Sequence, residues 1–252
     1  MVKRWLASAK ALFDSMLGRS GKKNTGIVVV GMAKSRKYGT CPGADADAEA
    51  MRRILKGYGR TSVLVNGGAT RASFVSAMQD ALRKPLCILY YSGHGTRMKD
   101  KRGEGGYSEA LCLDDGLFHD YELWSLVMQA KGRVFMIFDC CHSGTMYRSA
   151  EEGQAPVAES PAPDPDCGFR FCLAEKYMAR SSGINLLVWS GCPAEGLSYG
   201  DSTGGSLTWG IRSGYRKNRT YNDVWTVAKY AAKEQNPVCT KLGDGFMGLI
   251  FR

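Results

Sequence analysis

Short, uninterrupted apolar runs alternate along this chain with segments whose apolar residues recur at helical spacing, and no other feature constrains the fold as strongly. A strand that is apolar on consecutive residues is covered on both faces, and strands separated by helices pair in parallel. The sequence therefore predicts an α/β fold, a three-layer α/β/α sandwich with a mostly parallel central sheet. The predicted strands are Gly26–Gly31, Ser62–Val65, Leu86–Tyr91, Val134–Asp139, Leu186–Trp189 and a last short one at Gly248–Phe251. The predicted helices are Asp45–Lys56, Arg71–Leu82, Asp120–Gln129, Ser206–Ser213 and Tyr221–Glu234, and Tyr107–Leu117 is predicted to form an additional hairpin.

The sequence divides into a short extension and one domain, since 252 residues are enough for a single domain with an ample core. We expect residues 1–24 to form a basic amphipathic extension and residues 25–252 to form the domain. A loop is expected at residues 150–168, because Ala150–Cys167 holds four prolines, five acidic residues and no basic one. This loop separates residues 25–149 from residues 169–252.

The net charge of +10 is concentrated at the start of the chain, where residues 1–23 contribute +5. Apolar residues between Val2 and Leu17 recur at helical spacing and form one stripe. Two interpretations stay open: a helix that contacts a membrane surface or targets an organelle, and a terminal helix whose stripe packs on the domain. No basic stretch is interleaved with stacking aromatic residues, so nucleic acid is not an expected partner.

The lengths of the apolar runs and the number of cysteines bear on the cellular compartment of the protein. No run approaches the roughly 20 apolar residues that a membrane-spanning helix needs. The nine cysteines are an odd number and no signal-peptide core precedes them, which disfavours a secreted disulfide scaffold. We therefore expect an intracellular, cytoplasmic monomer with mostly reduced thiols, or delivery to an organelle by residues 1–23.

Two of the predicted buried strands end in glycine-rich turns. Leu86–Tyr91 runs into Ser92–Gly95, and Val134–Asp139 runs into Cys140–Gly144, which contains two cysteines and a histidine. The carboxyl ends of parallel strands meet at one crevice, so both turns are expected at the same site. A cysteine attacks as its thiolate, which an imidazole can generate, and glycines let a substrate approach the backbone N–H groups. The two turns together predict a Cys–His catalytic site.

His94 is the best candidate for the base among the three histidines. His142 adjoins Cys141, and adjacent side chains on a strand point to opposite sides, whereas His119 lies in a polar stretch before a helix. The same alternation separates Cys140 from Cys141, one facing the crevice and one packing inward, but the pattern does not decide which. A metal site is not expected at these residues, because the chain has no C-x-x-C motif and no histidine pair at i, i+4.

The two turns resemble the paired catalytic signatures of the metacaspases, which are caspase-like cysteine peptidases. The matching segments are YYSGHG (Tyr90–Gly95) and DCCHSG (Asp139–Gly144). Four more segments resemble the family in the same order: GADADAEAM (Gly43–Met51), WSGCPAEGLS (Trp189–Ser198), GGSLTWGI (Gly204–Ile211) and QNPVC (Gln235–Cys239). The resemblance implies a caspase-like sandwich in which residues 25–149 correspond to the large subunit and residues 169–252 to the small one.

The resemblance also implies the activity, that of an endopeptidase that cuts after Arg or Lys. It implies His94 as the base, Cys141 as the nucleophile, and the backbone N–H groups of Gly95 and Cys141 as the oxyanion hole. The implied pocket for the basic substrate residue is lined by Asp47, Ser92 and Asp139. Two carboxylates without a cation repel each other, and a guanidinium binds a carboxylate through two parallel hydrogen bonds, so an acidic pocket suits such a substrate.

The expected partners are therefore proteins or peptides with Arg or Lys before the cut. Contact of residues 2–17 with a membrane surface stays open as a further interaction. The alternative is a non-proteolytic scaffold or aggregate-handling module with the same fold.

Calcium activation is typical of metacaspases, and here the sequence departs from them. The acidic calcium positions of the family correspond to Ser108, His119, Asp120 and Arg148, so one carboxylate is left. Calcium needs about six to eight oxygen ligands, and we expect weak or absent activation by calcium and no cofactor for the chemistry itself. The remaining calcium candidates are Glu109 and Asp120, with Asp114, Asp115 and Glu122 close by.

Family members often cleave themselves in the loop that follows the nucleophile. The acidic loop of this chain contains no Lys or Arg, so an enzyme specific for basic residues could cut only at its edges. We expect self-processing to be limited, with Arg148, Arg170, Lys176 and Arg180 as the candidate sites.

Overall fold

The computed structural model describes residues 24–99, 107–142, 184–192, 200–216, 220–243 and 245–246, and at positions 97, 99, 107, 141, 142 and 201 it describes the backbone only. Its centre is a sheet with the strand order β12-β9-β8-β5-β1-β4. Five of these six strands are parallel, and β12 at one edge runs antiparallel to β9. The strands are β1 (Thr25–Gly31), β4 (Gly59–Val65), β5 (Leu86–Lys99), β8 (Arg133–His142), β9 (Leu186–Ser190) and β12 (Val238–Leu242).

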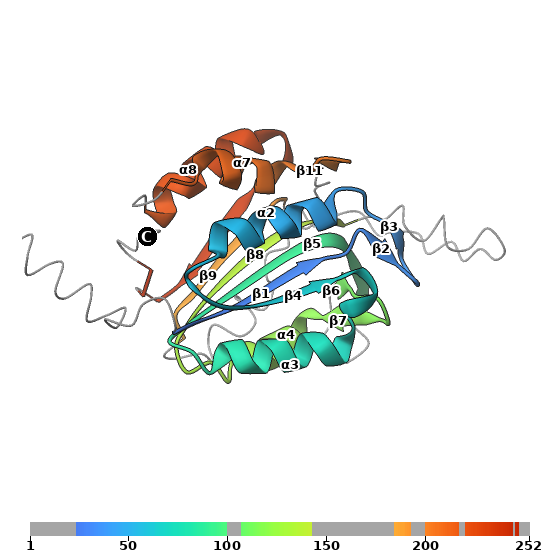
Figure 1. Ribbon diagram of the computed structural model, residues 1–252, viewed down its shortest axis with the longest axis horizontal. Helices are drawn as coiled ribbons and strands as arrows, with labels where there is room; N and C mark the ends of the chain where they lie inside the picture. Colours follow the sequence, from blue (N-terminus) through green and yellow to red (C-terminus); the bar gives the residue numbers. More distant parts are fainter. Residues whose placement is uncertain are drawn as a thin grey trace, which may run out of the picture.

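Helices cover both faces of the sheet and make three layers (Figure 1). One face carries α2 (Ala44–Leu55), α7 (Ser206–Gly214) and α8 (Tyr221–Ala231), and the other carries α3 (Arg71–Leu82) and α4 (Asp120–Val127). Alternate residues of one strand pack on opposite faces: Ile27 and Val29 lie in the core under α2, and Val28 and Val30 in the core over α3. The expected α/β/α sandwich is confirmed, and the unbroken apolar runs are explained by burial on both faces.

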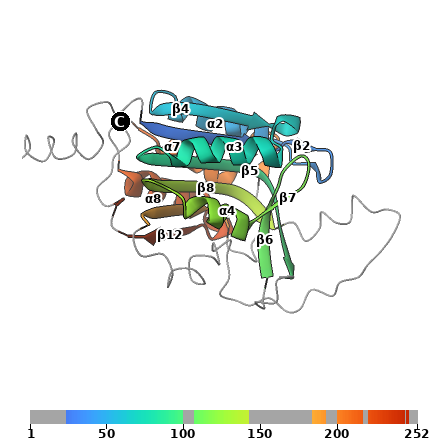
Figure 2. The same cartoon turned by 90° about the horizontal axis from the view of Figure 1, so that it is seen from below.

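Smaller elements extend the sheet at its carboxyl end. Strand β5 continues past the others and pairs antiparallel with β6 (Tyr107–Cys112), which in turn pairs with β7 (Leu117–His119). Figure 2 shows β5 and β6 projecting together from the body of the domain. Two short hairpins accompany them: β2 (Lys34–Ser35) with β3 (Gly39–Thr40), and β10 (Gly200–Asp201) with β11 (Gly204–Gly205).

Most predicted elements are present. Helix α3 has the predicted bounds, because Thr70 and Ser73 form a reciprocal capping box at its start. The predicted hairpin at Tyr107–Leu117 is also present, as β6 and β7. The last predicted helix ends earlier than expected, at Ala231, and a 3₁₀ turn (Lys233–Gln235) follows it.

The last described strand is β12, at Val238–Leu242, and the strand predicted at Gly248–Phe251 lies outside the described residues. Residues 1–23 and the loop at 150–168 lie outside them as well. Within the described ranges, no helix combines the length and the apolar character needed to cross a bilayer.

Candidate active site

The two glycine-rich turns meet on neighbouring strands at the carboxyl edge of the sheet. Strands β5 and β8 are parallel, and their register pairs Ser92 with Asp139 and His94 with Cys141. Neighbouring strands lie about 4.8 Å apart, so the backbone at position 141 is directly beside that of His94. Position 95 is paired with position 142 in the same ladder. The structure therefore brings together the segments that hold the expected base, nucleophile and oxyanion donors.

The imidazole of His94 is held in one tautomer. Its Nε2 lies 2.7 Å from the carbonyl oxygen of Thr40. A carbonyl oxygen only accepts hydrogen bonds, so Nε2 must carry the proton and Nδ1 must keep its lone pair in the neutral ring. Nδ1 is buried and has no hydrogen-bond partner among the described side chains. Burial lowers the pKa of His94, opposed in part by the bond to Thr40, so the ring is neutral near pH 7 and able to accept a proton.

Tyr91 and Gly93 fix the backbone that presents this ring. The buried hydroxyl of Tyr91 lies 2.6 Å from the carbonyl oxygen of His94 and 3.0 Å from that of Cys112, and so joins β5 to the end of β6. Gly93 adopts φ +154°, and a Cβ there would lie 2.7 Å from the Cβ of Met32 and 2.9 Å from the Tyr91 hydroxyl. A side chain at position 93 would therefore displace His94, the expected base.

Thr40 belongs to the β2–β3 hairpin, which is anchored on the neighbouring loops. Asp114 accepts the backbone N–H of Arg36 at 3.1 Å and its guanidinium at 2.5 Å, and these bonds lower the pKa of the Asp114 carboxyl. Asn66 accepts the backbone N–H of Lys34 at 2.8 Å. Sequence reasoning missed Thr40, because a backbone carbonyl carries no residue-type signal.

The adjacent cysteines are separated as alternation requires. Cys140 is buried in the core beneath α3 and α4, together with Met136 and Phe138. Cys140 is therefore the cysteine that packs inward, which the pattern alone left open. No disulfide is formed among the six cysteines whose side chains the structure describes, Cys140 among them.

Two buried carboxylates lie together beside these strands. Asp47, in the first turn of α2, is 2% exposed, and its Oδ2 accepts the Ser92 hydroxyl at 3.0 Å and the Gly205 N–H at 2.8 Å. Asp139, on β8, is 5% exposed, and its Oδ2 accepts the N–H of Thr208 at 2.7 Å and the hydroxyl of Thr208 at 2.6 Å. The structure thus places all three expected pocket residues, Asp47, Ser92 and Asp139, in one cluster.

The cluster also contains residues that the sequence analysis did not assign. Because the Thr208 hydroxyl gives its proton to Asp139, the buried Tyr90 hydroxyl, 2.5 Å away, must donate to Thr208. Gly204, at φ +130°, and Gly205 lie against the two carboxylates so closely that a Cβ on either would collide with Asp47 or Asp139. The segment GGSLTWGI held this signal, since only glycines allow β11 to approach the acids so closely.

The electrostatics of the cluster favour a cation. Burial, and secondly the charge of Asp139, raise the pKa of Asp47 to about 7, although the bonds from Gly205 and Ser92 and the charge of Arg212 work against this shift. Within the described part of the chain, no ion pair reaches Asp47. A basic side chain entering here would remove the repulsion and restore the charged form of Asp47.

The expected calcium positions are also brought together, but as a hydrogen-bonded group. The Ser108 hydroxyl lies 2.8 Å from Oδ1 of Asp120 and 3.2 Å from Nδ1 of His119. One hydroxyl, one imidazole and one carboxylate bonded to each other do not fit calcium, which binds six to eight oxygens. Glu109 is buried on the next residue of β6, and Arg148 lies outside the described residues.

The other acids near this group are engaged by arginines. Asp114 binds Arg36, as described above, and Asp115 accepts the backbone N–H of Arg71 at 2.8 Å. The guanidinium of Arg71 pairs with Glu122, which also accepts the N–H of His119. Across the described ranges, no group of three or more His, Cys, Asp or Glu side chains is arranged to hold a metal ion. The four candidate processing sites, Arg148, Arg170, Lys176 and Arg180, lie outside these ranges.

Comparisons with known proteins agree with this architecture. Residues 27–240 match the family model of the caspase domain. Metacaspase-1A of Aspergillus oryzae is 25% identical over 234 residues, which cover 69% of this chain and 55% of that protein. Metacaspase-4 of Arabidopsis thaliana is 29% identical over 112 residues, 42% of this chain and 27% of that protein. The chain thus spans about half or less of the length of these relatives.

Solved structures show the same fold. Protein GSU0716 of Geobacter sulfurreducens superimposes with a TM-score of 0.65 at 22% identity, over 88% of this chain and 94% of that one. Caspase-1 of Spodoptera frugiperda superimposes with a TM-score of 0.54 at 11% identity, over 87% of each chain.

Proposed function

The chain belongs to the caspase domain family, and from that premise we propose that it is a cysteine endopeptidase that cuts peptide bonds after Arg or Lys through Cys141 and His94. The observation that carries the proposal is the register of β5 and β8, in which His94 and Cys141 are partners. It is supported by the tautomer of His94, whose unprotonated Nδ1 is the atom a base needs.

The reaction begins with transfer of the Cys141 thiol proton to Nδ1 of His94. The thiolate attacks the scissile carbonyl carbon, and the negative charge that develops on its oxygen is held by the N–H groups of Gly95 and Cys141. The C–N bond then breaks, and His94 returns its proton to the leaving amine. Water, deprotonated by His94, hydrolyses the thioester and regenerates the thiol. Throughout these steps the Thr40 carbonyl accepts the Nε2–H bond and stabilises the imidazolium form.

Specificity for a basic residue comes from Asp47, Asp139 and Ser92. The side chain of the residue before the cut enters the pair of buried carboxylates, and its positive charge offsets their repulsion and the cost of burying them. A guanidinium can bridge both acids with parallel hydrogen bonds, whereas an ammonium offers a single point charge, so we expect Arg to be preferred over Lys.

We also propose that cleavage needs no calcium and no other cofactor. The side chains at the family's calcium positions bond to each other, and the neighbouring acids hold Arg36 and Arg71. If cuts within the chain occur, Arg148, Arg170, Lys176 and Arg180 are the residues expected before them.

Fluorogenic peptides with Arg, Lys or Asp before the cut test this proposal, each with and without millimolar calcium. We expect cleavage after Arg and Lys only, unchanged by calcium, and abolished in Cys141→Ala and His94→Ala. Cys140→Ala is the matched control: it removes a thiol from the same strand but from the core side, and it should stay active. Cleavage after Asp would contradict the acidic pocket, and full activity of Cys141→Ala would contradict the assignment of the nucleophile. Saturable stimulation by calcium would contradict the proposal that no metal is needed.

A further inference from the structure

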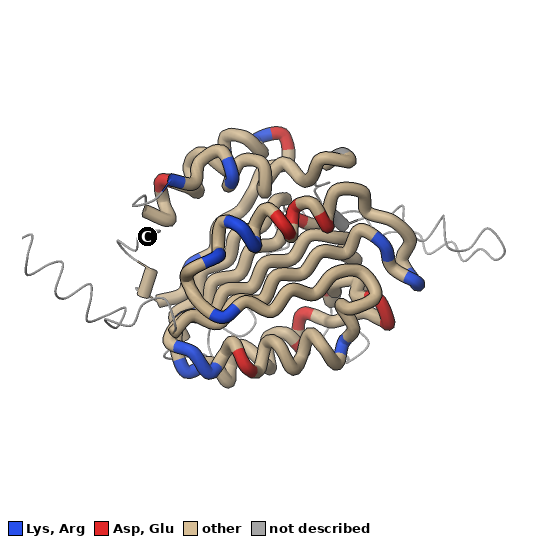
Figure 3. The backbone as a smooth tube through the Cα atoms, in the orientation of Figure 1, with Lys and Arg blue, Asp and Glu red and all other residues tan. Residues whose placement is uncertain are grey.

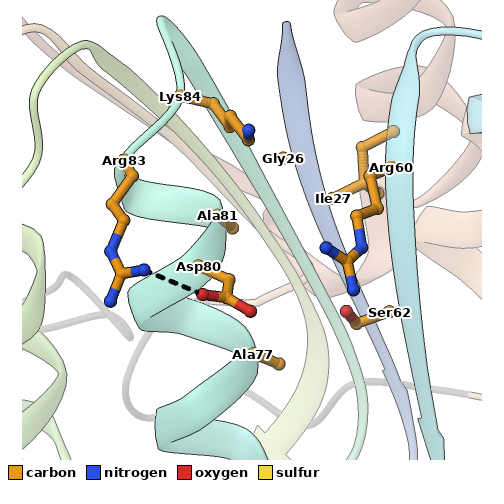
Figure 4. A pocket seen from close by; sticks show the side chains of 9 residues that line it. All are labelled: Gly26, Ile27, Arg60, Ser62, Ala77, Asp80, Ala81, Arg83 and Lys84. Atoms are coloured by element: carbon orange, nitrogen blue, oxygen red, sulfur yellow. Dashed lines mark hydrogen bonds and ion pairs between the residues drawn. The ribbon is translucent and has the colours of Figure 1, made fainter. Parts of the chain in front are cut away.

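A hollow with a volume of about 210 Å³ opens between helix α3 and the edge strand β4, away from the candidate active site. Its polar walls are Arg60 and Ser62 on β4, and Asp80, Arg83 and Lys84 at the end of α3 (Figure 4). Gly26, at the beginning of β1, also lines it. In the sheet register Gly26 is the partner of Arg60, so the hollow lies where the parallel strands begin.

The polar groups of the hollow are mostly without partners. Within the described part of the chain, the side chains of Arg60, Ser62 and Lys84 make no hydrogen bond or ion pair. Arg83 reaches Asp80 at 3.3 Å, but both side chains are more than half exposed, at 68% and 56%, and such a pair contributes little. Arg60 and Lys84 therefore face the space from two walls. The single acid, Asp80, points into it, and Arg83 lies on the far side of Asp80 (Figure 4).

The end of α3 is the negative end of its helix dipole, so the cationic side chains of the hollow have to outweigh it, and backbone donors on two carbonyl oxygens weaken this opposition. Ala81 O accepts the N–H of Lys84 at 3.0 Å, and Leu82 O accepts the N–H of Lys131 at 3.0 Å. Figure 3 shows Lys and Arg gathered around this end of the sheet, on the last turn of α3, the start of β4 and the end of α2. The charge that these surroundings add is limited, because α2 covers the opposite face of the sheet and Arg52 and Arg53 at its end pair with Glu49.

We propose that this hollow is a binding site for a phosphate group, held between Arg60 and Lys84, with the Ser62 hydroxyl as a further donor. A phosphate dianion offers several acceptor oxygens, and the guanidinium fork and ammonium from facing walls match it with charge-assisted hydrogen bonds. The space is also suitable, since about 210 Å³ is open to water-sized molecules where roughly 10–15 Å³ is enough for one water.

The site is separate from the proposed chemistry. Seven residues of β1 run between the beginning of the strand and the carboxyl edge, a distance of roughly 20 Å. A phosphate in the hollow should therefore leave peptide cleavage unchanged, and the site does not depend on the proposed function.

The test measures binding of inorganic phosphate to the full chain by calorimetry and by the shift of the melting temperature, with chloride at equal ionic strength as the reference. We expect saturable binding that Arg60→Gln/Lys84→Gln weakens at least about tenfold, since charge-assisted hydrogen bonds are lost. Lys229→Gln/Lys241→Gln, the matched control, removes the same charge from exposed positions on α8 and β12 and should bind as the wild type. Asp80→Asn removes the one acid and should bind phosphate more tightly. A folding defect can only weaken binding, so a gain in this variant cannot arise from one.

A second arm identifies the source of the phosphate. Vesicles of phosphatidylcholine with and without phosphatidic acid are sedimented with the protein and its variants. Retention on phosphatidic acid that Arg60→Gln/Lys84→Gln abolishes supports the site with a lipid headgroup as its source, and a response to inorganic phosphate alone supports it with a soluble one. Equal phosphate binding by wild type and Arg60→Gln/Lys84→Gln, or an equal loss in the charge control, would overturn the proposal.

Discussion

Replacing Asp47 with Asn should stabilise the fold and at the same time remove cleavage after Arg. The fold raises the pKa of Asp47 from 3.8 to about 7, a shift of roughly 3 units. Each unit corresponds to about 1.4 kcal/mol, so the ionised carboxylate makes the free energy of unfolding about 4 kcal/mol smaller at alkaline pH than at acid pH. The neutral amide of Asn should avoid this cost.

The direction in which the free energy of unfolding changes with pH follows from proton binding to Asp47. Between pH 4 and pH 7 the folded protein holds a proton on Asp47 that the unfolded chain has released, so the stabilisation from this group is complete below pH 4. It is lost as the pH rises through 7. Asn does not titrate, its carbonyl oxygen can still accept the Gly205 and Ser92 bonds, and its amide can donate toward Asp139.

Denaturant unfolding of wild type and Asp47→Asn at pH 5 and pH 8 checks this prediction. We expect the variant to be more stable by about 4 kcal/mol at pH 8, a melting-temperature rise on the order of 10 °C. At pH 5 the difference should be less than half as large, because the unfolded chain releases this proton from about pH 4 upward. Asp45→Asn is the matched control, because Asp45 lies in the same helical turn but is exposed. The same variant should lose at least about 100-fold in kcat/KM for Arg peptides. An Asp47→Asn protein no more stable than wild type at pH 8 would refute the account of a strained acid pair.

Three further predictions concern the base, the loop that covers the acids, and pH. Tyr91→Phe removes the donor shared by the His94 and Cys112 carbonyls. In denaturant unfolding it should lower the free energy of unfolding by about 1–3 kcal/mol, and in steady-state kinetics it should lower kcat more than it changes KM. An unchanged kcat would argue against a role of Tyr91 in positioning His94. Gly205→Ala places a Cβ against Asp139 at a position where the backbone is extended (φ −85°), and should raise KM for Arg peptides at least about tenfold. Gly68→Ala is the control, because a Cβ there meets no atom within 4 Å and its φ is not positive. For the wild type, kcat/KM for Arg peptides should rise as the pH increases through about 7, because Asp47 ionises in this range. In Asp47→Asn this rise should be absent. If both proteins show the same pH profile, the ionisation of Asp47 is not its cause.

The fold could be predicted where a local pattern and the tertiary environment agree. The apolar runs of β1, β8 and β9 are buried on both faces, and the capping box of Thr70 marks the beginning of α3. The sequence predicts that the strand β5 ends at Tyr91, because Gly93 and Gly95 are typical of a turn. The structure continues the strand to Lys99, since β8 and β6 pair with it on either side.

The site could be predicted as far as residue type carries the chemistry. The two turns of the sequence contain a histidine, a cysteine and an aspartate in recognisable order, and the register aligns them. Thr40 contributes only a carbonyl oxygen, which every residue has. The bonds from Gly205 to Asp47 and from Thr208 to Asp139 join residues 158 and 69 positions apart, so only the tertiary structure shows them.

The acidic cluster links the binding of a ligand to the association of two parts of the chain, because it is assembled from residues on both sides of a long connection. Asp47, Ser92 and Asp139 precede that connection, and Gly205 and Thr208 follow it. A ligand that binds only the assembled cluster adds RT ln(1 + [L]/Kd) to the free energy that holds the two parts together. In a molecule cut within the connection, an arginine-containing ligand at a hundred times its Kd would therefore tighten the association of the two fragments by about 2.7 kcal/mol, roughly a hundredfold. The proposed substrate pocket would then also join the two fragments, to an extent that depends on the concentration of the ligand.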